Sequence, residues 1–164
     1  MSTSGRRPAI AAVDIDGVLA DVRHRLHHVE KRPKDWDAFF AAAADDPPLE
    51  EGLRVARELA AVADLVYLSG RPEHLRRDTL AWLARHRLPA GELHLRPRRD
   101  FRPARVLKVE VLDRLSAERP VSVLVDDDPG VCEAARAAGY DVLPATWMGA
   151  APALHEAQEA DGAT

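Results

Sequence analysis

Short apolar runs alternate along the chain with longer segments in which apolar residues recur every three or four positions. The runs predict buried strands, and the longer segments predict amphipathic helices. The predicted strands cover residues 8–13, 62–68, 92–95, 121–125 and 141–143. The predicted helices cover residues 49–61, 72–86, 105–117 and 131–138. This alternation is typical of an α/β fold, a Rossmann-like parallel sheet with helices on both faces.

Two segments fall outside this alternation. Residues 21–48 are polar and rich in histidine, then helical around 36–44, which predicts a small flap inserted after the first strand. Residues 151–164 are rich in alanine and acidic residues, and we expect a frayed helix or tail there. A length of 164 residues favours one domain, which we place at 1–150.

The amino-acid composition favours a globular protein over a membrane protein. A content of 46% hydrophobic and 30% charged residues suits a globular domain, and no apolar run approaches the roughly 18 residues of a membrane helix. The apolar run after the twin arginine at 6–7 is too short for a signal peptide. The single cysteine, Cys132, excludes an internal disulfide framework. We therefore expect a cytoplasmic protein without membrane association.

The first predicted strand ends in two aspartates, Asp14 and Asp16, followed by Gly17. In an open α/β sheet, ligands bind beyond the carboxyl ends of the strands. Carboxylates two residues apart in extended chain point the same way, and glycine allows a sharp turn after them. The pair predicts a divalent-metal site with a nucleophilic carboxylate, with turn capping as the alternative. A calcium loop is excluded, because Arg23 stands where its bidentate glutamate belongs.

The second predicted strand ends in Ser69, Gly70 and Arg71, followed by Pro72. The hydroxyl of Ser69 could hold a phosphate oxygen. Proline suits the first position of a helix, so a helix beginning at Pro72 would offer its free N–H groups to an anion. Taken alone, this strand end is a weak signal.

The fourth predicted strand ends in Asp126, Asp127 and Asp128. Asp128 before Pro129 is explained as a helix N-cap. The other two carboxylates repel each other unless a cation or solvent accommodates them, and Mg²⁺ is a cation that binds few protein carboxylates. Lys108 is one of only three lysines, and an isolated lysine is most often a surface residue.

The order of these motifs resembles the haloacid dehalogenase superfamily of phosphotransferases, over roughly residues 10–140. Finer details are similar to the 3′-phosphatase domain of polynucleotide kinase/phosphatase. They are Leu-Ser-Gly-Arg at 68–71, the spacing of Asp100 and Arg102 before Lys108, and the position of Arg25. The resemblance implies a phosphatase with at most a minimal cap.

The resemblance and the chemistry together imply a role for each motif. Asp14 would attack phosphorus and form an aspartyl-phosphate, while Asp16 would protonate the leaving group and later deprotonate water. Lys108 and Ser69 would bind phosphoryl oxygens. Mg²⁺ would be held by Asp14, the backbone carbonyl of Asp16, Asp126 and Asp127. The implied substrate-binding residues are Arg25, Gly70, Arg71, Arg96 and Arg102.

The predicted substrate is a 3′-phosphorylated DNA or RNA end. A small flap leaves the site open to a polymer, and the arginine-rich stretch 94–105 could bind phosphates, although such a charge run is usually a solvated face. Trp36, Phe39 and Phe40 are assigned to the flap core, with base stacking as the alternative. The sequence has no Walker loop and hence no sign of a kinase domain, which leaves a stand-alone phosphatase or one that works with separate kinase or ligase repair proteins.

Two other functions fit part of the pattern. Asp-Gly-Val-Leu-Ala-Asp at 16–21 also resembles small deoxynucleotidases, so a soluble 5′(3′)-nucleotidase is the enzymatic alternative. A non-catalytic receiver-like phosphoacceptor module is disfavoured, because Ser69 stands where receivers place their acceptor aspartate. His24, His27 and His28 lack a carboxylate or cysteine at ligand spacing, which favours a polar flap over a zinc site.

Overall fold

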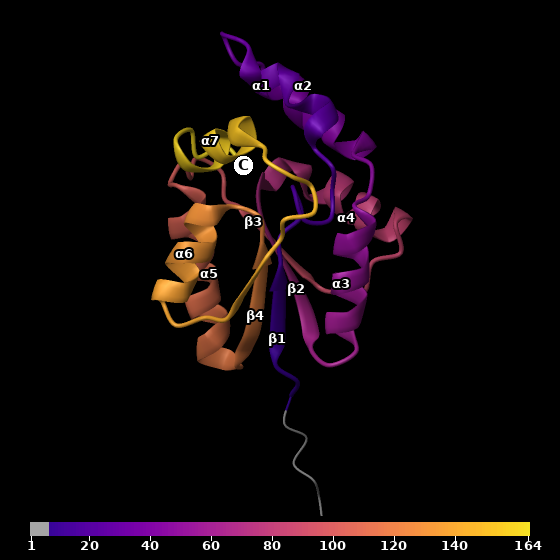
Figure 1. The fold of residues 1–164 in the computed structure, drawn as a ribbon, viewed down its shortest axis with the longest axis vertical. Helices are drawn as coiled ribbons and strands as arrows, with labels where there is room; N and C mark the ends of the chain where they lie inside the picture. The colour runs from indigo at the N-terminus through magenta and orange to yellow at the C-terminus, as the bar shows by residue number, and fades with distance from the viewer. Residues whose placement is uncertain (1–6) are drawn as a thin grey trace, which may run out of the picture.

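The computed structural model describes residues 7–164. Five parallel strands form one sheet in the order β3-β2-β1-β4-β5 (Figure 1). The Rossmann-like sheet predicted from the apolar runs is thereby confirmed. The strands are β1 (Ile10–Val13), β2 (Asp64–Pro72), β3 (Glu92–Arg96), β4 (Val121–Asp126) and β5 (Val142–Pro144).

The central strand β1 is buried on both faces, because helices cover the sheet on both sides (Figure 1). Successive side chains of a strand point to opposite faces. Ala11 and Val13 accordingly pack with residues of α3 and α4, whereas Ile10 and Ala12 pack with α5 and α6. These helices are α3 (Glu50–Ala60), α4 (Arg76–Arg85), α5 (Ala104–Glu118) and α6 (Pro129–Ala137).

The chain after the second strand differs from the prediction. Strand β2 continues through Pro72, a short 3-10 helix covers Glu73–Leu75, and α4 begins only at Arg76. The proline ring fixes φ but leaves ψ free, and Pro72 takes the extended ψ of 149°. The expected helix N-terminus at Pro72 is therefore wrong, and Ser69, Gly70 and Arg71 are strand residues.

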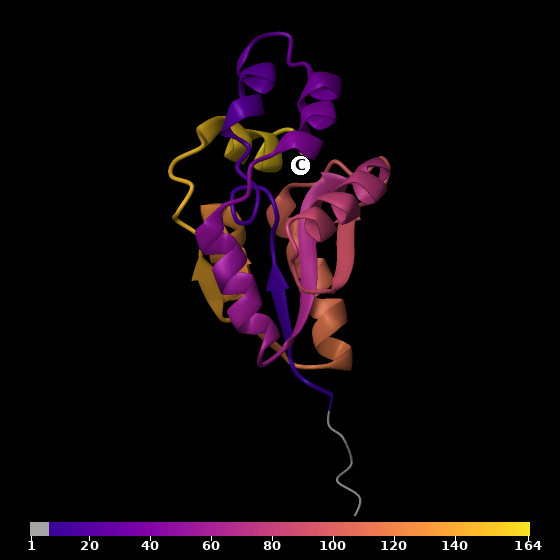
Figure 2. The ribbon, with the colours of Figure 1, turned by 90° about the vertical axis from the view of Figure 1, so that its right-hand side faces the viewer.

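Residues 21–48 form the predicted small flap beyond the carboxyl ends of the strands (Figures 1 and 2). Phe39 and Val29 of the flap pack against Leu154 and Met148 from the end of the chain. The final segment therefore contains a helix with one buried side rather than a frayed tail. These elements are the 3-10 helices Arg23–Arg25 and Ala42–Asp45, and the helices α1 (His27–Glu30), α2 (Trp36–Ala41) and α7 (Pro152–Glu159).

A close contact fixes α3 against the loop that follows β1. A Cβ atom built on Gly52 of α3 would lie 1.8 Å from the carbonyl oxygen of Val18. Only glycine allows the helix to approach the loop this closely. Within residues 7–164, none of the helices combines the length and the apolar character needed to cross a bilayer.

Candidate active site

Three aspartates from two neighbouring strands meet at the carboxyl edge of the sheet. The amide of Asp14 donates a hydrogen bond to the carbonyl of Val125 at 2.9 Å, so the chain after β1 stays aligned with the end of β4. Carboxylate oxygens of Asp14, Asp126 and Asp127 all lie within 4.8 Å of one another. Residues more than a hundred positions apart in sequence thus form one acidic cluster.

Lys108 reaches this cluster from α5 and is only 1% exposed, so it is not a surface lysine. Its Nζ donates a hydrogen bond to Asp126 Oδ2 at 2.6 Å and lies 3.0 Å from Asp14 Oδ2. Burial lowers the pKa of Lys108, but the carboxylates of Asp126 and Asp14 outweigh burial and raise it. The lysine is therefore a buried cation fixed beside Asp14.

The acidic cluster fits a divalent cation. Asp14 Oδ2 lies beside the Lys108 ammonium group, but neither it nor the buried Asp127 Oδ1 accepts a hydrogen bond with good geometry from the described residues. Burial, with the neighbouring carboxylates, raises the pKa of Asp14 and brings that of Asp126 to about 6. Oxygen ligands with unsatisfied lone pairs and excess negative charge are the donors that Mg²⁺ takes. Asp14, Asp126 and Asp127 are the residues that could hold it.

Gly17 makes room for Asp127. Its φ of +79° lies in the region that glycine adopts without strain, and a Cβ at this position would lie 2.3 Å from Asp127 Oδ2. The glycine in Asp-x-Asp-Gly therefore lets the turn after β1 bend and lets the carboxylate from the end of β4 approach that turn.

Asp16 points away from the cluster, toward two arginines. Its Oδ1 accepts hydrogen bonds from Arg71 Nε at 2.8 Å, Arg71 Nη2 at 2.6 Å and Arg25 Nη2 at 3.1 Å. Burial raises the pKa of Asp16, but the two guanidinium groups outweigh burial and lower it to about 2. The side chain is thus an ionised carboxylate in this arrangement, and it is not part of the three-aspartate cluster.

Asp46, at the end of the flap, is a central residue that sequence reasoning missed. It accepts hydrogen bonds from Arg25 Nε at 2.7 Å and from Arg71 Nη2 at 2.8 Å, and it lies 2.7 Å from His24 Nε2. Two carboxylates and two guanidinium groups therefore form one buried network that ties the flap to β1 and β2. The only signal in the sequence was an acidic pair, Asp45-Asp46, before two prolines.

Ser69 and Gly70 emerge at the end of β2. Val13 pairs with Tyr67 in the β1–β2 register, which puts Ser69 beside the turn that carries Asp14 and Asp16. The Ser69 hydroxyl oxygen accepts a hydrogen bond from the Arg71 amide at 3.2 Å. Ser69 therefore lies at the same edge of the sheet as the acidic cluster, as the strand pattern predicted.

The predicted substrate arginines Arg96 and Arg102 already have protein partners. Arg96 is buried and donates hydrogen bonds to the carbonyl oxygens of Gly70 and Arg102. Arg102 is exposed and forms ion pairs with Asp100 at 2.7 Å and Glu110 at 2.6 Å. Neither guanidinium group points freely into the site in this arrangement.

Two other predictions at the site edge can be compared with the structure. Asp128 caps α6 as predicted, because its side chain accepts hydrogen bonds from the amides of Gly130 and Val131. His27 and His28 lie against each other in the flap, with 3.9 Å between ring centroids and a tilt of 40° between the ring planes. Among residues 7–164, the group of side chains that could hold a metal ion consists of aspartates alone.

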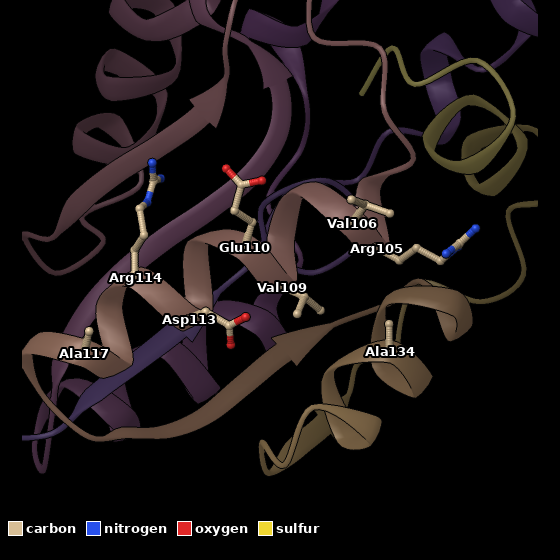
Figure 3. Close-up of a pocket in the computed structure, with 8 residues that line it drawn as sticks. All are labelled: Arg105, Val106, Val109, Glu110, Asp113, Arg114, Ala117 and Ala134. Carbon is tan, nitrogen blue, oxygen red and sulfur yellow. The ribbon is translucent and has the colours of Figure 1, made fainter.

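Two hollows of the surface differ in their relation to the candidate site. One of about 690 Å³ lies on the outer face of α5 beside Ala134 of α6 and contains none of the candidate residues (Figure 3). Another, of about 380 Å³, lies between the flap and the loop after β3, where Trp36, Phe40 and Arg96 contribute to its wall. Of these two, only the second contains a residue that contacts the candidate site.

Comparison with known proteins identifies the family. Residues 8–146 match the family described as the polynucleotide kinase PNKP phosphatase domain. No curated protein sequence matches the chain significantly.

Solved structures share the fold. The chain is similar to part of the Pnkp1/Rnl/Hen1 complex, with a TM-score of 0.69, 22% identity, and coverage of 87% of this chain and 47% of that one. A second structure, of the Pnkp1/Rnl/Hen1 RNA repair complex, gives a TM-score of 0.68 and 22% identity over 88% and 43%. The chain thus spans about half the length of these proteins.

A haloacid dehalogenase-like hydrolase, SP0104 from Streptococcus pneumoniae, gives a TM-score of 0.60 at 14% identity, with coverage of 93% and 91%. Identities this low show the fold alone, whereas the family match covers most of the chain. The chain therefore belongs to the family of polynucleotide kinase phosphatase domains, within the haloacid dehalogenase superfamily.

Proposed function

We propose that this phosphatase domain is a Mg²⁺-dependent phosphomonoester hydrolase that removes 3′-phosphates from nucleic acid ends. The observation that carries the proposal is the convergence of Asp14, Asp126, Asp127 and Lys108 at one edge of the sheet. A phosphate monoester is a dianion, so a carboxylate can attack it only where cations offset the negative charge. The cluster supplies one fixed ammonium group and a set of oxygens suited to a metal ion.

The residues divide the hydrolysis into two displacements. A carboxylate oxygen of Asp14 forms a bond to phosphorus, the bond from phosphorus to the ester oxygen breaks, and that oxygen takes a proton from Asp16. Water then attacks phosphorus and gives its proton to Asp16, the bond from phosphorus to the Asp14 oxygen breaks, and phosphate leaves. Lys108 and Ser69 hold the phosphoryl oxygens. Mg²⁺ bound by Asp14, Asp126 and Asp127 would offset the charge that builds up on the phosphoryl group.

In this arrangement Asp16 has the protonation state needed for the second displacement, in which it accepts a proton. The Asp16 carboxylate is ionised, so it can accept the proton of the attacking water, but a pKa of about 2 makes it a weak base. To protonate the leaving oxygen, Asp16 must be released from Arg25 and Arg71 and must take up a proton. Both guanidinium groups carry five donors and suit phosphate oxygens as well as carboxylates, so a bound phosphate would compete with Asp16 for them.

The hollow beside the flap supports a polynucleotide substrate. Trp36 and Phe40 stack at 25°, with 5.9 Å between ring centroids, and Phe101 on the opposite loop is 71% exposed. Arg98 and Arg99 of the same loop are exposed and have no ion-pair partner among residues 7–164. Trp36 and Phe40 are half-buried against the flap core, and Phe101 is exposed. Aromatic rings next to arginines are typical of surfaces that bind single-stranded nucleic acid.

Separate repair proteins are the partners that we propose. The matched structures include one titled as an RNA repair complex, in which a chain about twice as long contains a similarly folded part. We infer that this phosphatase acts in the same kind of end-processing reaction, with kinase or ligase activity supplied by other proteins or regions.

Phosphate release from a 3′-phosphorylated oligonucleotide and from the matching 3′-mononucleotide tests the substrate. We call the hollow beside the flap, with Trp36, Phe40 and Phe101 in its wall, the aromatic hollow. We expect the oligonucleotide to give a kcat/KM about tenfold higher than the mononucleotide, because its bases can stack on these aromatic rings. A preference of that size for the mononucleotide would identify a nucleotidase instead. A chain that takes up one phosphate without turnover would be a phosphoacceptor module.

A further inference from the structure

The candidate catalytic side chains are closed off from solvent. Asp14, Ser69 and Lys108 are each 1% exposed, and Asp16 is 2% exposed. A phosphate monoester cannot reach these groups until a covering segment moves. Residues 161–164, which follow α7, touch the site directly and lie outside the range that matches the family.

Thr164 contacts the atoms that a substrate would need. Its Oγ1 donates a hydrogen bond to Asp16 Oδ2 at 3.3 Å, on the carboxylate oxygen that the two arginines leave free. Its carbonyl accepts a hydrogen bond from Arg96 Nη2 at 3.3 Å. Its main chain lies so close to Gly70 that a Cβ there would be 2.1 Å from the Thr164 carbonyl carbon. Thr164 thus places an alcohol on the proposed general acid.

The rest of the segment lies between Asp16 and the hollow beside the flap. Asp161, Gly162 and Ala163 form part of the wall of the aromatic hollow, so the segment connects that hollow to Asp16. It is held there by an ion pair between Asp161 and Lys34 of the flap and by the Ala163 amide, which donates to Ala157 at 3.1 Å.

We propose that residues 161–164 are a built-in competitor of the substrate, with the Thr164 hydroxyl occupying the position of the alcohol that takes a proton from Asp16 as it leaves phosphorus. This inference rests on the proposed role of Asp16. Docking of the segment and binding of a nucleic acid end exclude each other. The larger the fraction of molecules with a docked segment, the weaker the apparent affinity for every phosphomonoester.

Gly162 offers a single substitution that should release the segment. Its φ is +55°, and a Cβ would lie 1.9 Å from the backbone oxygen of Phe101, so Gly162→Ala cannot keep the docked arrangement. Gly139→Ala is the matched control, because Gly139 also has a positive φ, +96°, but its Cβ position is open. We expect Gly162→Ala to lower KM for p-nitrophenyl phosphate about threefold or more, and Gly139→Ala to leave it unchanged.

Substitutions of Thr164 test the alcohol itself. Thr164→Val keeps the shape but removes the hydroxyl, so it should lower KM in the same direction as Gly162→Ala, by about twofold. Thr164→Ser keeps the hydroxyl and should behave like the parent protein. Equal effects of valine and serine would overturn the role of the hydroxyl.

Hydrogen exchange of residues 157–164 measures docking without any turnover. Exchange in this segment should be slow in the parent protein, fast in Gly162→Ala, and faster in the parent once an oligonucleotide with a free 3′-hydroxyl is added. Fast exchange in the unliganded parent would show that the docked state is not populated, and would overturn the proposal. The proposal would also be overturned if the segment were released in Gly162→Ala but KM were unchanged.

The same data separate this inference from the proposed function. If no variant hydrolyses any phosphomonoester, the proposed activity fails, while exchange with the oligonucleotide still decides whether the segment competes with nucleic acid. If p-nitrophenyl phosphate is hydrolysed equally by all variants, the activity stands and the competitor role is wrong.

Discussion

The surroundings of Asp16 oppose its proposed role as a general acid. Two arginines and a buried second carboxylate surround it, and its pKa of about 2 contrasts with the partly protonated acid that the reaction class requires. Arg25 and Arg71 are also predicted substrate-binding residues, so we expect substrate binding to change the ion pairs that hold Asp16 ionised.

Substitution of Asp16 should affect substrates according to their leaving groups. Asp16→Asn cannot donate or accept the proton, so we expect kcat for an alkyl phosphate to fall about 100-fold or more. Hydrolysis of p-nitrophenyl phosphate should fall much less, because nitrophenolate leaves without protonation. Steady-state kinetics on both substrates checks this. Equal losses would contradict the acid role.

At the scale of elements, α3 is positioned by the contact between Gly52 and Val18. A glycine in a helix normally costs stability, and alanine there would add about 1 kcal/mol. Here the added methyl would meet a backbone oxygen, so we expect Gly52→Ala to destabilise the protein by about 2 kcal/mol. Chemical denaturation measures this, and the exposed Glu50→Ala in the same helix should change stability by less than about 0.5 kcal/mol. A stabilised Gly52→Ala would show that the helix does not need this close approach.

The loop after β3 should contribute to affinity for polymers only. Replacing Arg98 and Arg99 with alanine removes two cations that line the hollow beside the flap and have no ion-pair partner in the described part of the chain. We expect KM for a 3′-phosphorylated oligonucleotide to rise about fivefold and its salt dependence to weaken, because fewer counterions are released on binding. KM for p-nitrophenyl phosphate should not change. Arg114→Ala, on the outer face of α5, is the control (Figure 3). A uniform effect on both substrates would argue against a polymer-binding loop.

For the molecule as a whole, local pattern was sufficient to predict the sheet and the strand ends. The apolar runs located all five strands, and the cap at Asp128 followed from one proline. The boundary at Pro72 was missed because proline fits extended chain as well as a helix. Asp46 and Thr164 were missed because long-range packing of the flap and the final segment brings them to Asp16, and no local pattern encodes that contact.

Metal binding should be visible as a change in stability. Mg²⁺ at about 100 times its Kd would stabilise the folded state by about 2.7 kcal/mol, or a Tm increase of about 5 °C or more. Asp127→Asn removes one charged ligand and should lose most of this increase. Thermal unfolding with Mg²⁺ and with chelator measures it. A Tm that does not respond to Mg²⁺ would mean that the cluster does not bind the ion under those conditions.

The most direct test of the account is multiple-turnover phosphate release from a 3′-phosphorylated oligonucleotide, with Mg²⁺ and with excess chelator. We expect many turnovers per molecule with Mg²⁺, loss of activity with chelator, and no turnover in Asp14→Asn under either condition. Turnover that persists in Asp14→Asn, or that is indifferent to chelation, would contradict a mechanism built on this cluster.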